Sequence, residues 1–376
     1  MIRLIVEEAI SRTIVDRDLE VKDLRFAASL SGPCRIEFTH TFKGPGYDPV
    51  ILEPWKHLIH VEKNINGVRK IIGTGIVQPS EKDDKGDYQI KAEGFSNYPV
   101  KIPWLQNWNP VVVDPFEVVH KIWDHVQSYP QGNLGVVVYP ESSGTFLLPG
   151  YSFDGASLNI DFFAMFIRSA DFRDCGDEVN ALARDIPFDY LEHSEWNGSR
   201  TAVNKKIELS YPSRGVERTG MILRFGENVI SGKPKATPEI DYASDIIVKG
   251  WFPGKVYSST FSNAEVDRLR RVVRHDDVFV NSKERAAVWA KRKLARRQTP
   301  PHWETLTISE SHPNAPFGQW ELGDTIQAEG YMPWVGRVKA PHRIMGYSID
   351  DKGSGTVELT LKHEGAFNYD PIDFEG

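Results

Sequence analysis

The segment Trp303-Glu304-Thr305-Leu306-Thr307-Ile308-Ser309 is a clear strand pattern within the region 281–349, around which the second half of this 376-residue chain is organised. A basic segment, 282–298, precedes it and is predicted to be a helix that breaks at Thr299-Pro300-Pro301. Three further strand candidates follow it: Trp320–Ala328, Val335–Val338 and Arg343–Ile349. A helix, a strand and returning strands in this order predict a small antiparallel barrel, and nothing in the region indicates catalysis.

Residues 1–109 also consist of short segments that are typical of strands. Asn66-Gly67, between the strand candidates Leu58–Lys63 and Val68–Val77, is a strong signal for a hairpin turn. The other strand candidates are Arg3–Val6, Thr13–Val15, Asp23–Ser29, Cys34–Thr41 and Tyr88–Ala92. Many short strands with turn residues between them and no helix predict a first closed antiparallel barrel.

From Asp114 onward the pattern mixes helices and strands. Asp114 as the N-cap and Pro115 at the first helical position predict a helix start, and apolar residues at helical spacing extend this helix over 115–128. A second helix is expected over 171–184. Strands are expected at Val136–Tyr139, Phe188–Glu192 and Lys206–Tyr211. This middle region is therefore predicted to be α+β and to form a separate layer or an inserted domain.

The segment 261–300 is predicted to be helical, and it carries eleven basic residues against five acidic ones. Two interpretations stay open. The basic side chains dock onto an acidic partner or face a channel that carries DNA, or they form a solvated helix face whose C-terminal cations complement the helix dipole. The elements expected before this segment are a hairpin of 221–225 and 228–230 across Gly226, a Gly/Lys/Pro-rich loop at 232–238 and a strand at 246–252.

The composition excludes several classes of protein. The formal charge is −7, so the chain as a whole is not a nucleic-acid binder by electrostatics. Cys34 and Cys175 are the only cysteines and form no C-x-x-C pair, so neither a disulfide framework nor a zinc site is expected and a reducing cytosol fits. The N-terminus becomes charged after a few apolar residues and is predicted to be a strand rather than a signal peptide.

Apolar and aromatic residues bear on membranes and on partners. The longest apolar run, Phe162–Ile167, is far shorter than the roughly 20 residues of a bilayer span, so no stable membrane insertion is expected. This run is either a buried core segment or an exposed patch for a partner. The 10 tryptophans fit either aromatic-rich barrel cores or contacts between subunits.

No motif indicates a nucleophile elbow, a zinc protease, a phosphate-binding loop or a dinucleotide-binding fold. Gly73-Thr74-Gly75 lacks a third glycine and lies within a strand pattern. His120 and His125 are five apart on a helix, and His57 and His60 are three apart in a strand, so neither pair is well placed to bind one metal ion.

Two groups of carboxylates could be imagined as the acid pair of a glycosidase. One is Glu192 with Glu195; the other is Asp171, Asp174 and Asp177. The second group falls at a predicted helix start, where the dipole favours carboxylates without any catalytic role. We therefore predict no catalytic, cofactor-binding or metal-binding residue and no enzyme activity.

Four stretches carry a resemblance to a known family: Leu52–Trp55 with Gly73–Val77; Asp177–Ala183 with Ile186–Tyr190; Tyr242–Trp251; and Ala286–Arg296 with Leu322–Ile326. In them the chain resembles the tail hub proteins (baseplate hub or tail-associated minor tail proteins) of long-tailed bacteriophages, especially of siphophages that infect actinobacteria. The resemblance covers most of the chain in order. It implies two similar tail-tube-like β-barrels with two peripheral segments, and assembly as a homotrimer.

The implied domain division has five parts: 1–109 as the first β-barrel, 110–200 as the α/β insertion, 201–260 with 301–367 as the second β-barrel, 261–300 as the basic helical segment and 368–376 as a C-terminal tail. Three copies of a chain with two like barrels place six barrels around one axis. Such a trimer can mate with the six-fold rings of a tail tube and with a three-fold spike or fibre.

The function implied is structural. The chain is expected at the tail tip of the virion, after synthesis in the bacterial host cytoplasm, as a hub that closes the distal end of the tail tube and takes part in opening the channel. Expected partners are the distal tail protein ring, the C-terminus of the tape-measure protein and other minor tail or fibre proteins, with genomic DNA only in passing. One alternative is a receptor- or carbohydrate-binding tail protein that uses Trp104, Trp108 or Trp196; another is a cell-wall hydrolase.

Overall fold

The structure is a computed structural model. It describes residues 2–41, 52–80, 87–108, 113–144, 150–154, 157–161, 169–185, 188–238, 240–252, 255–262, 268–277, 280, 283–350 and 355–367. The apolar run Phe162–Ile167 and the tail 368–376 lie outside these residues, so their predicted roles are not addressed by the structure.

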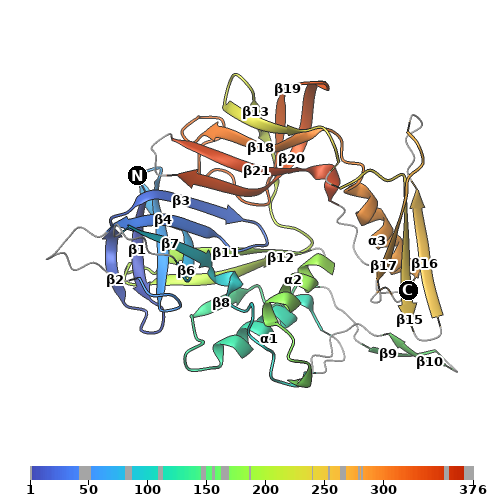
Figure 1. Ribbon diagram of the computed structural model, residues 1–376, viewed down its shortest axis with the longest axis horizontal. Coiled ribbons are helices and arrows are strands. Elements are labelled where there is room, and N and C mark those ends of the chain that lie inside the picture. The colour runs from blue at the N-terminus through green and yellow to red at the C-terminus, as the bar shows by residue number, and fades with distance from the viewer. Residues whose placement is uncertain are drawn as a thin grey trace.

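The chain is mainly β, as predicted, and its largest element is a 13-stranded sheet (Figure 1). The first strand group of this sheet comprises β1 (Ile2–Glu8), β2 (Ile14–Leu19), β3 (Lys22–Ser29), β4 (Arg35–Thr41), β5 (His57–Ile65), β6 (Val68–Val77) and β7 (Asp87–Gly94). The second strand group comprises β13 (Glu217–Arg224), β14 (Val229–Lys235), β18 (His302–Ser309), β19 (Thr325–Met332), β20 (Gly336–Asp350) and β21 (Thr356–His363).

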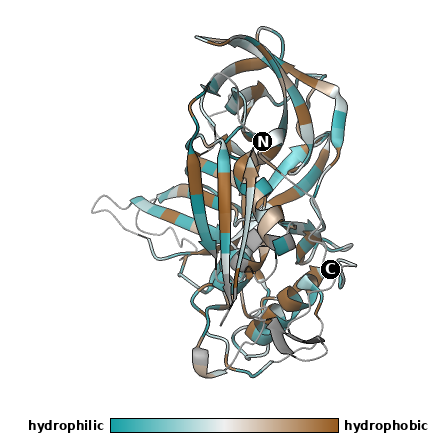
Figure 2. Cartoon of the chain, turned by 90° about the vertical axis from the view of Figure 1, so that its right-hand side faces the viewer, coloured by the Kyte–Doolittle hydropathy of each residue, from teal (hydrophilic) through white to brown (hydrophobic). Residues whose placement is uncertain are grey.

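The two strand groups are joined edge to edge by the antiparallel pairing of β20 with β3, in which Gly346 is opposite Ser29 and Asp350 is opposite Arg25. One hydrophobic core runs through both groups and includes Leu4 and Phe26 from the first and Trp303 and Leu359 from the second. Hydrophobic and hydrophilic residues alternate along many of these strands, as expected for strands with one buried face (Figure 2). Among the described strands, no pairing closes either group into a ring of its own.

A second layer packs beside the first strand group. Its sheet consists of β8 (Val136–Tyr139), β12 (Val203–Ser210) and β11 (Asp189–Trp196), with β12 in the middle. Its helices are α1 (Pro115–Gln127) and α2 (Cys175–Asp185), and a small hairpin is formed by β9 (Gly150–Asp154) and β10 (Ser157–Asp161). The predicted cap of the first helix is confirmed, because Asp114 Oδ1 accepts a hydrogen bond from the Phe116 N–H at 2.8 Å.

A third unit lies at the side of the molecule in Figure 1. Its sheet has the order β16 (Lys255–Ser262), β15 (Asp245–Phe252), β17 (Val272–Asp277), and it packs against α3 (Lys283–Ala295). The prediction that 261–300 is helical is therefore wrong for the part that forms β17. Val272 and Val273 are β-branched and pair in parallel with β15, a partner that a local pattern does not reveal.

The same pairing corrects the predicted composition of the second barrel. Residues 245–260 were expected to join the strands after Pro301, but β15 pairs with β16 on one side and with β17 on the other instead. Their apolar side chains pack in a separate small core with Ala286, Ala290 and Leu294 of α3. β12, which starts at Val203, likewise pairs with β11 and β8 rather than with the second strand group.

The hairpin expected across Gly226 is not formed. β13 pairs in parallel with β19, and β14 pairs antiparallel with β18. The Asn228 side chain explains the divergence, since its Oδ1 accepts from the Arg224 N–H at 2.7 Å and its Nδ2 donates to the Ile222 carbonyl at 2.9 Å. These bonds occupy backbone groups that a hairpin ladder would use. β14 also extends to Lys235, so most of the loop predicted at 232–238 is strand.

Candidate functional site

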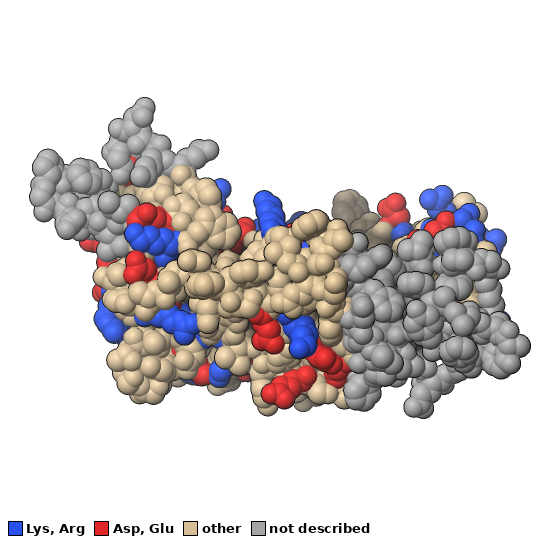
Figure 3. Space-filling model, turned by 90° about the horizontal axis from the view of Figure 1, so that it is seen from below, with Lys and Arg blue, Asp and Glu red and all other residues tan. Residues whose placement is uncertain are grey.

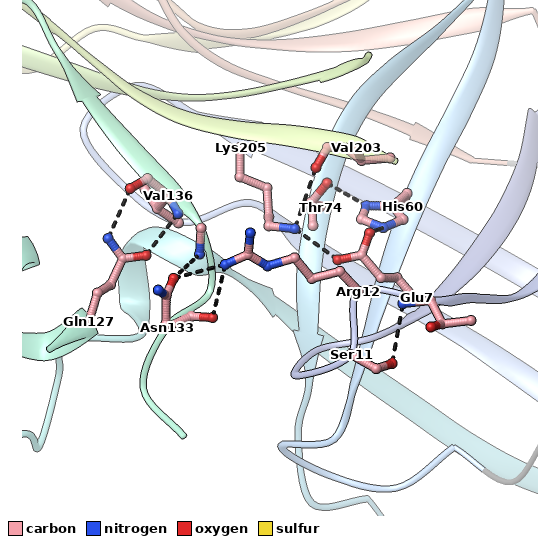
Figure 4. Close-up of polar contacts among 12 residues, drawn as sticks. Glu7, Ser11, Arg12, His60, Thr74, Gln127, Asn133, Val136, Val203 and Lys205 are labelled. Carbon is pink, nitrogen blue, oxygen red and sulfur yellow. Dashed lines mark hydrogen bonds and ion pairs between the residues drawn. The ribbon is translucent and has the colours of Figure 1, made fainter. Parts of the chain in front are cut away.

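A buried polar network joins the first strand group to the β8–β12–β11 sheet (Figure 4). Lys205 on β12 donates to Glu7 Oε1 on β1 at 2.8 Å, and Glu7 Oε2 lies 3.2 Å from His60 Nε2. The other ring nitrogen, His60 Nδ1, is 2.8 Å from Thr74 Oγ1. All four side chains are almost completely buried, so this contact is a fixed part of the interior rather than a surface ion pair.

The electrostatics of this network follow from its burial. Burial alone would raise the pKa of Glu7, but the hydrogen bonds and charges of His60 and Lys205 outweigh it and lower the pKa below its ordinary value. Burial lowers the pKa of His60, against the opposing effect of Glu7. A neutral His60 then donates from Nε2 to Glu7 and accepts the Thr74 hydroxyl at Nδ1, which satisfies every polar atom of the ring.

A second, more exposed set of hydrogen bonds also connects the first strand group to the β8–β12–β11 sheet (Figure 4). Arg12, in the turn after β1, donates to Asn133 Oδ1 at 2.9 Å, and the same oxygen accepts from the Gly135 N–H. The Gln127 side chain at the end of α1 bonds both backbone groups of Val136. The turn after β1, the helix α1 and the strand β8 are therefore held in one arrangement.

Glu62 forms a second buried ionic cluster at the same boundary. Its Oε1 accepts from Arg200 at 2.7 Å and from the Trp196 indole N–H at 2.8 Å, and its Oε2 accepts from Arg3 at 2.5 Å. Burial acts to raise the pKa of Glu62, but these donors lower it overall. The guanidinium groups of Arg17 and Arg200 lie 5.8 and 5.3 Å from the Trp196 ring centroid, so this tryptophan belongs to the joint.

A buried ion pair also connects the second strand group to the same sheet. Asp189 at the start of β11 accepts hydrogen bonds from the Arg343 guanidinium and, at 2.7 Å, from the Arg214 N–H. Arg343 also donates to the Arg214 carbonyl at 2.8 Å and to the Gly323 carbonyl at 3.1 Å. The β8–β12–β11 sheet is thus fastened to both strand groups through buried charges.

The carboxylates considered for an acid pair do not come together as one. Glu192 accepts from the Cys34 N–H at 2.9 Å and from the Ser96 N–H, and burial raises its pKa. Glu195, three residues along the same strand, points to the other face and pairs with Lys206 at 2.6 Å.

Of the aspartates considered at the second helix, Asp174 has a structural role. Asp174 Oδ1 caps α2 by accepting from the Gly176 and Asp177 N–H groups at 2.9 and 3.1 Å. Its other oxygen accepts from the Lys101 N–H at 2.6 Å. The Cys175 thiol is also unreactive, because burial raises its pKa to about 12 and keeps it protonated.

The tryptophans named for carbohydrate binding are at least partly covered. Trp104 is buried against His125, with ring centroids 4.7 Å apart, and Trp108 is half-buried with its ring centroid 6.4 Å from that of Trp104. Sequence reasoning missed Trp334, which is 101% exposed in the turn between β19 and β20, beside the exposed Tyr331. Pro333 directly before it and Gly336 two residues after it favour a turn, but neither indicates that the ring is left in solvent.

The histidines of the pairs predicted to be poor metal ligands have other partners: His57 Nδ1 accepts from the Glu53 N–H, and the Nε2 atoms of His120 and His125 bond the carbonyls of Pro140 and Pro103. Across the described residues, no group of three or more His, Cys, Asp or Glu side chains is arranged to hold a metal ion. Sequence reasoning also missed one buried cluster, in which the ring centroids of three histidines lie 6.0–6.2 Å apart: His302, His342 and His363.

The basic residues of the third unit are largely engaged locally. Arg270 pairs with Asp245 at 3.1 Å, and Arg274 forms two bonds to Asp276. Lys293 lies 5.1 Å from the Trp289 ring centroid. In the view from below, basic and acidic side chains are interspersed over the described surface (Figure 3). None of the helices in the described ranges has the length and apolar character needed to cross a bilayer.

Neither a protein-family model nor a curated protein sequence matches this chain. Three solved structures share its fold over nearly its whole length. The 43 kDa tail protein of prophage MuSo2 from Shewanella oneidensis has a TM-score of 0.60 at 15% identity, covering 98% of this chain and 100% of that one.

The tail protein from Neisseria meningitidis MC58 gives a TM-score of 0.57 at 13% identity, with 98% and 99% of the two chains covered. Prophage tail protein gp18 from Listeria monocytogenes EGD-e gives 0.54 at 11% identity, with 96% and 95% covered. All three are described as tail proteins, two of them from prophages, and the likeness is one of fold.

Proposed function

We propose that this chain is a structural protein of a phage tail tip, where it acts as a trimeric hub. The observation that carries the proposal is the presence of two mainly antiparallel strand groups in one chain, joined through β20 and β3 and held by a shared sheet. The fold likeness to three tail proteins, two of them from prophages, over 95% or more of each chain supports it. Each strand group would correspond to one tail-tube-like barrel that is completed in the assembled tail.

Three such chains would place six strand groups around one axis. The trimer would then match a six-fold tube ring on one side and a three-fold tip on the other. It would close the distal end of the tube, contact the distal tail ring, the end of the tape-measure protein and further tip or fibre proteins, and line the passage when DNA leaves. The phage would be a siphophage of an actinobacterial host. No catalytic, cofactor or metal residue is needed for this role.

The strand pairings suggest how the domains divide under this proposal. The first unit keeps the borders 1–109, and the tail keeps 368–376. The insertion extends from 110 to about 212, because β12 pairs with β11. The second barrel unit comprises about 213–240 with 301–367, and the third unit comprises about 241–300, because β15 pairs with β17.

The test is the mass and symmetry of the purified protein. Light scattering should give about three times the 42.6 kDa of one chain, and electron micrographs should show three-fold views with six peripheral lobes. The same measurement is made after co-expression with a distal tail protein, since a ring can template the trimer. A chain that is monomeric alone and also in that mixture refutes the hub.

A further inference from the structure

The third unit has a strand edge without the features that usually prevent pairing with a further strand. β16 pairs with β15 in an antiparallel register that runs without a shift along all 8 residues of the strand. β16 forms the outer edge of the unit, and among the described strands it has no partner on its other side (Figure 1). From Val256 to Ser262 it contains neither a charged residue nor a proline. The unpaired N–H and C=O groups of such an edge are a template for another strand.

Other edge strands of the protein are protected. In β2, Asp16 Oδ1 accepts the Asp18 N–H at 2.8 Å, so this backbone donor of the edge strand is already used. β14 contains Pro234, which has no N–H to donate, and Lys233 beside it pairs with Glu304 at 2.6 Å. Charged residues and prolines of this kind keep sheet edges from associating. Their absence from β16 indicates that another segment covers its edge.

The two faces of β16 differ in the side chains that a neighbouring strand would need. Phe261 packs against the small core that contains the apolar residues of α3. On the other face Ser258 is exposed and lies opposite Lys249 of β15. Asp276 of β17, on the other side of Lys249, forms two hydrogen bonds to Arg274. A strand added to this edge therefore needs apolar side chains toward α3 and polar, preferably acidic, ones toward Lys249.

The charge of the third unit also favours an acidic occupant. Residues 241–300 carry thirteen basic and seven acidic side chains, a net charge of +6 in a chain whose formal charge is −7. Two copies of this unit would repel each other, which argues against pairing of β16 with the same strand of a second copy. An acidic strand is attracted by the same field.

The C-terminal tail, 368–376, has the required composition. It contains three acidic residues and no basic one. In Ile372-Asp373-Phe374-Glu375 a β-branched and an aromatic residue alternate with two carboxylates, which is the pattern of a strand with one apolar and one acidic face. Pro371 stands directly before this stretch, at a position where a strand accepts proline.

The tail also starts close to the third unit. η3 (Glu364–Ala366) lies beside α3, the helix that packs on β16. Phe367, which follows, is held by the bond of its N–H to the Glu364 carbonyl at 3.0 Å and by the Arg343 guanidinium, 5.1 Å from its ring centroid. Residues 368–376 can extend over about 30 Å, more than the length of β16, so the tail can reach this edge.

We propose that the C-terminal tail adds a strand to the outer edge of β16 in the same chain. Ile372 and Phe374 face α3, whereas Asp373 and Glu375 face Lys249. The backbone of this stretch pairs with the open edge, and its carboxylates offset part of the charge of the third unit. The proposal goes beyond the hub role and does not depend on trimer formation.

Engineered disulfides in the full-length protein test the pairing. Asp373→Cys is combined with Ser258→Cys or with Thr260→Cys, because facing side chains of adjacent strands have Cβ atoms about 4.5–5.5 Å apart. Under mild oxidation at least one of these pairs should form a disulfide within one chain, identified by mass spectrometry of the digested protein. Asp373→Cys with Ser231→Cys, at an exposed serine of the edge strand β14, is the matched control and should react about tenfold more slowly.

Hydrogen exchange gives a second readout without added cysteines. Replacing both Ile372 and Phe374 by serine should speed amide exchange in 256–262 by about tenfold and leave exchange in 229–235 of β14 unchanged. Three results would each overturn the proposal: equal reaction of Asp373→Cys with Ser231→Cys, disulfides that form only between two chains, and unchanged exchange in 256–262 of the serine variant.

Discussion

Replacing Lys205 by methionine should destabilise the protein more than any exposed lysine substitution. The change leaves Glu7 buried without its cation, and breaking a buried ion pair in this way costs about 3–5 kcal/mol. With an unfolding entropy of about 2.1 cal/mol/K per residue over the whole chain, that cost lowers Tm by roughly 4–6 °C. His60 cannot compensate, because burial lowers its pKa and favours the neutral ring.

The assay is a thermal melt of Lys205→Met, Glu7→Gln and the double variant, with Lys206→Met as the control. Lys206 is the next residue on β12, but its partner Glu195 is 45% exposed, so its loss should cost less than about 1 kcal/mol. The double variant should recover at least about 1 kcal/mol relative to the sum of the single changes, because it leaves no unpaired charge. Equal Tm values for Lys205→Met and Lys206→Met would refute the assignment of this pair as a structural joint.

Three further outcomes are expected. His342→Gln should reduce the loss of Tm that the protein shows on acidification. Burial lowers the pKa of His342 to about 3, so this residue contributes its full stabilisation above its unfolded-state pKa of 6.5 and loses about 2 kcal/mol of it by pH 5. Parallel plots of Tm against pH for the two proteins would contradict this. Gly250→Ala should destabilise the third unit by about 1–3 kcal/mol, because the new Cβ would lie 1.7 Å from the Val280 carbonyl oxygen. Gly220→Ala is the control, since a Cβ there meets nothing within 4 Å. Limited proteolysis that releases the third unit equally from both variants would contradict the prediction. Trp334→Ser should change the free energy of unfolding by less than about 0.5 kcal/mol, because the ring is fully exposed; a melt several degrees lower would show that the ring packs against the protein.

Local signals in the sequence were sufficient for most elements. The cap formed by Asp114 and the proline after it located α1 within one residue, and Asn66-Gly67 located the turn between β5 and β6. Such signals act within a few residues of the structure they specify. The same is true of the strand at 303–309, which the structure extends by one residue to His302.

Pairing partners were not predictable in the same way. β17 was read as part of a helix because its charged residues, Arg274 to Asp277, obscure a short β-branched pair that finds its partner in β15. The missing hairpin at Gly226 depends on the side chain of Asn228, whose bonds redirect β13 toward a strand about 100 residues away. Tertiary partners decide these cases, and a single sequence does not display them.

The buried ion pairs between the strand groups and the β8–β12–β11 sheet could not be predicted from the sequence for a related reason. Lys205 and Glu7 are 198 positions apart, and neither stands in a pattern that marks it as buried. A buried ion pair adds little net stability compared with apolar residues of the same shape, but a misaligned one is costly, so such pairs discriminate between arrangements of the parts they join. Here one set of charges fixes the first strand group and another, at Asp189, fixes the second, both on the β8–β12–β11 sheet. We infer that this sheet sets the angle between the two strand groups, and in the proposed trimer that angle decides whether six of them can form a regular ring.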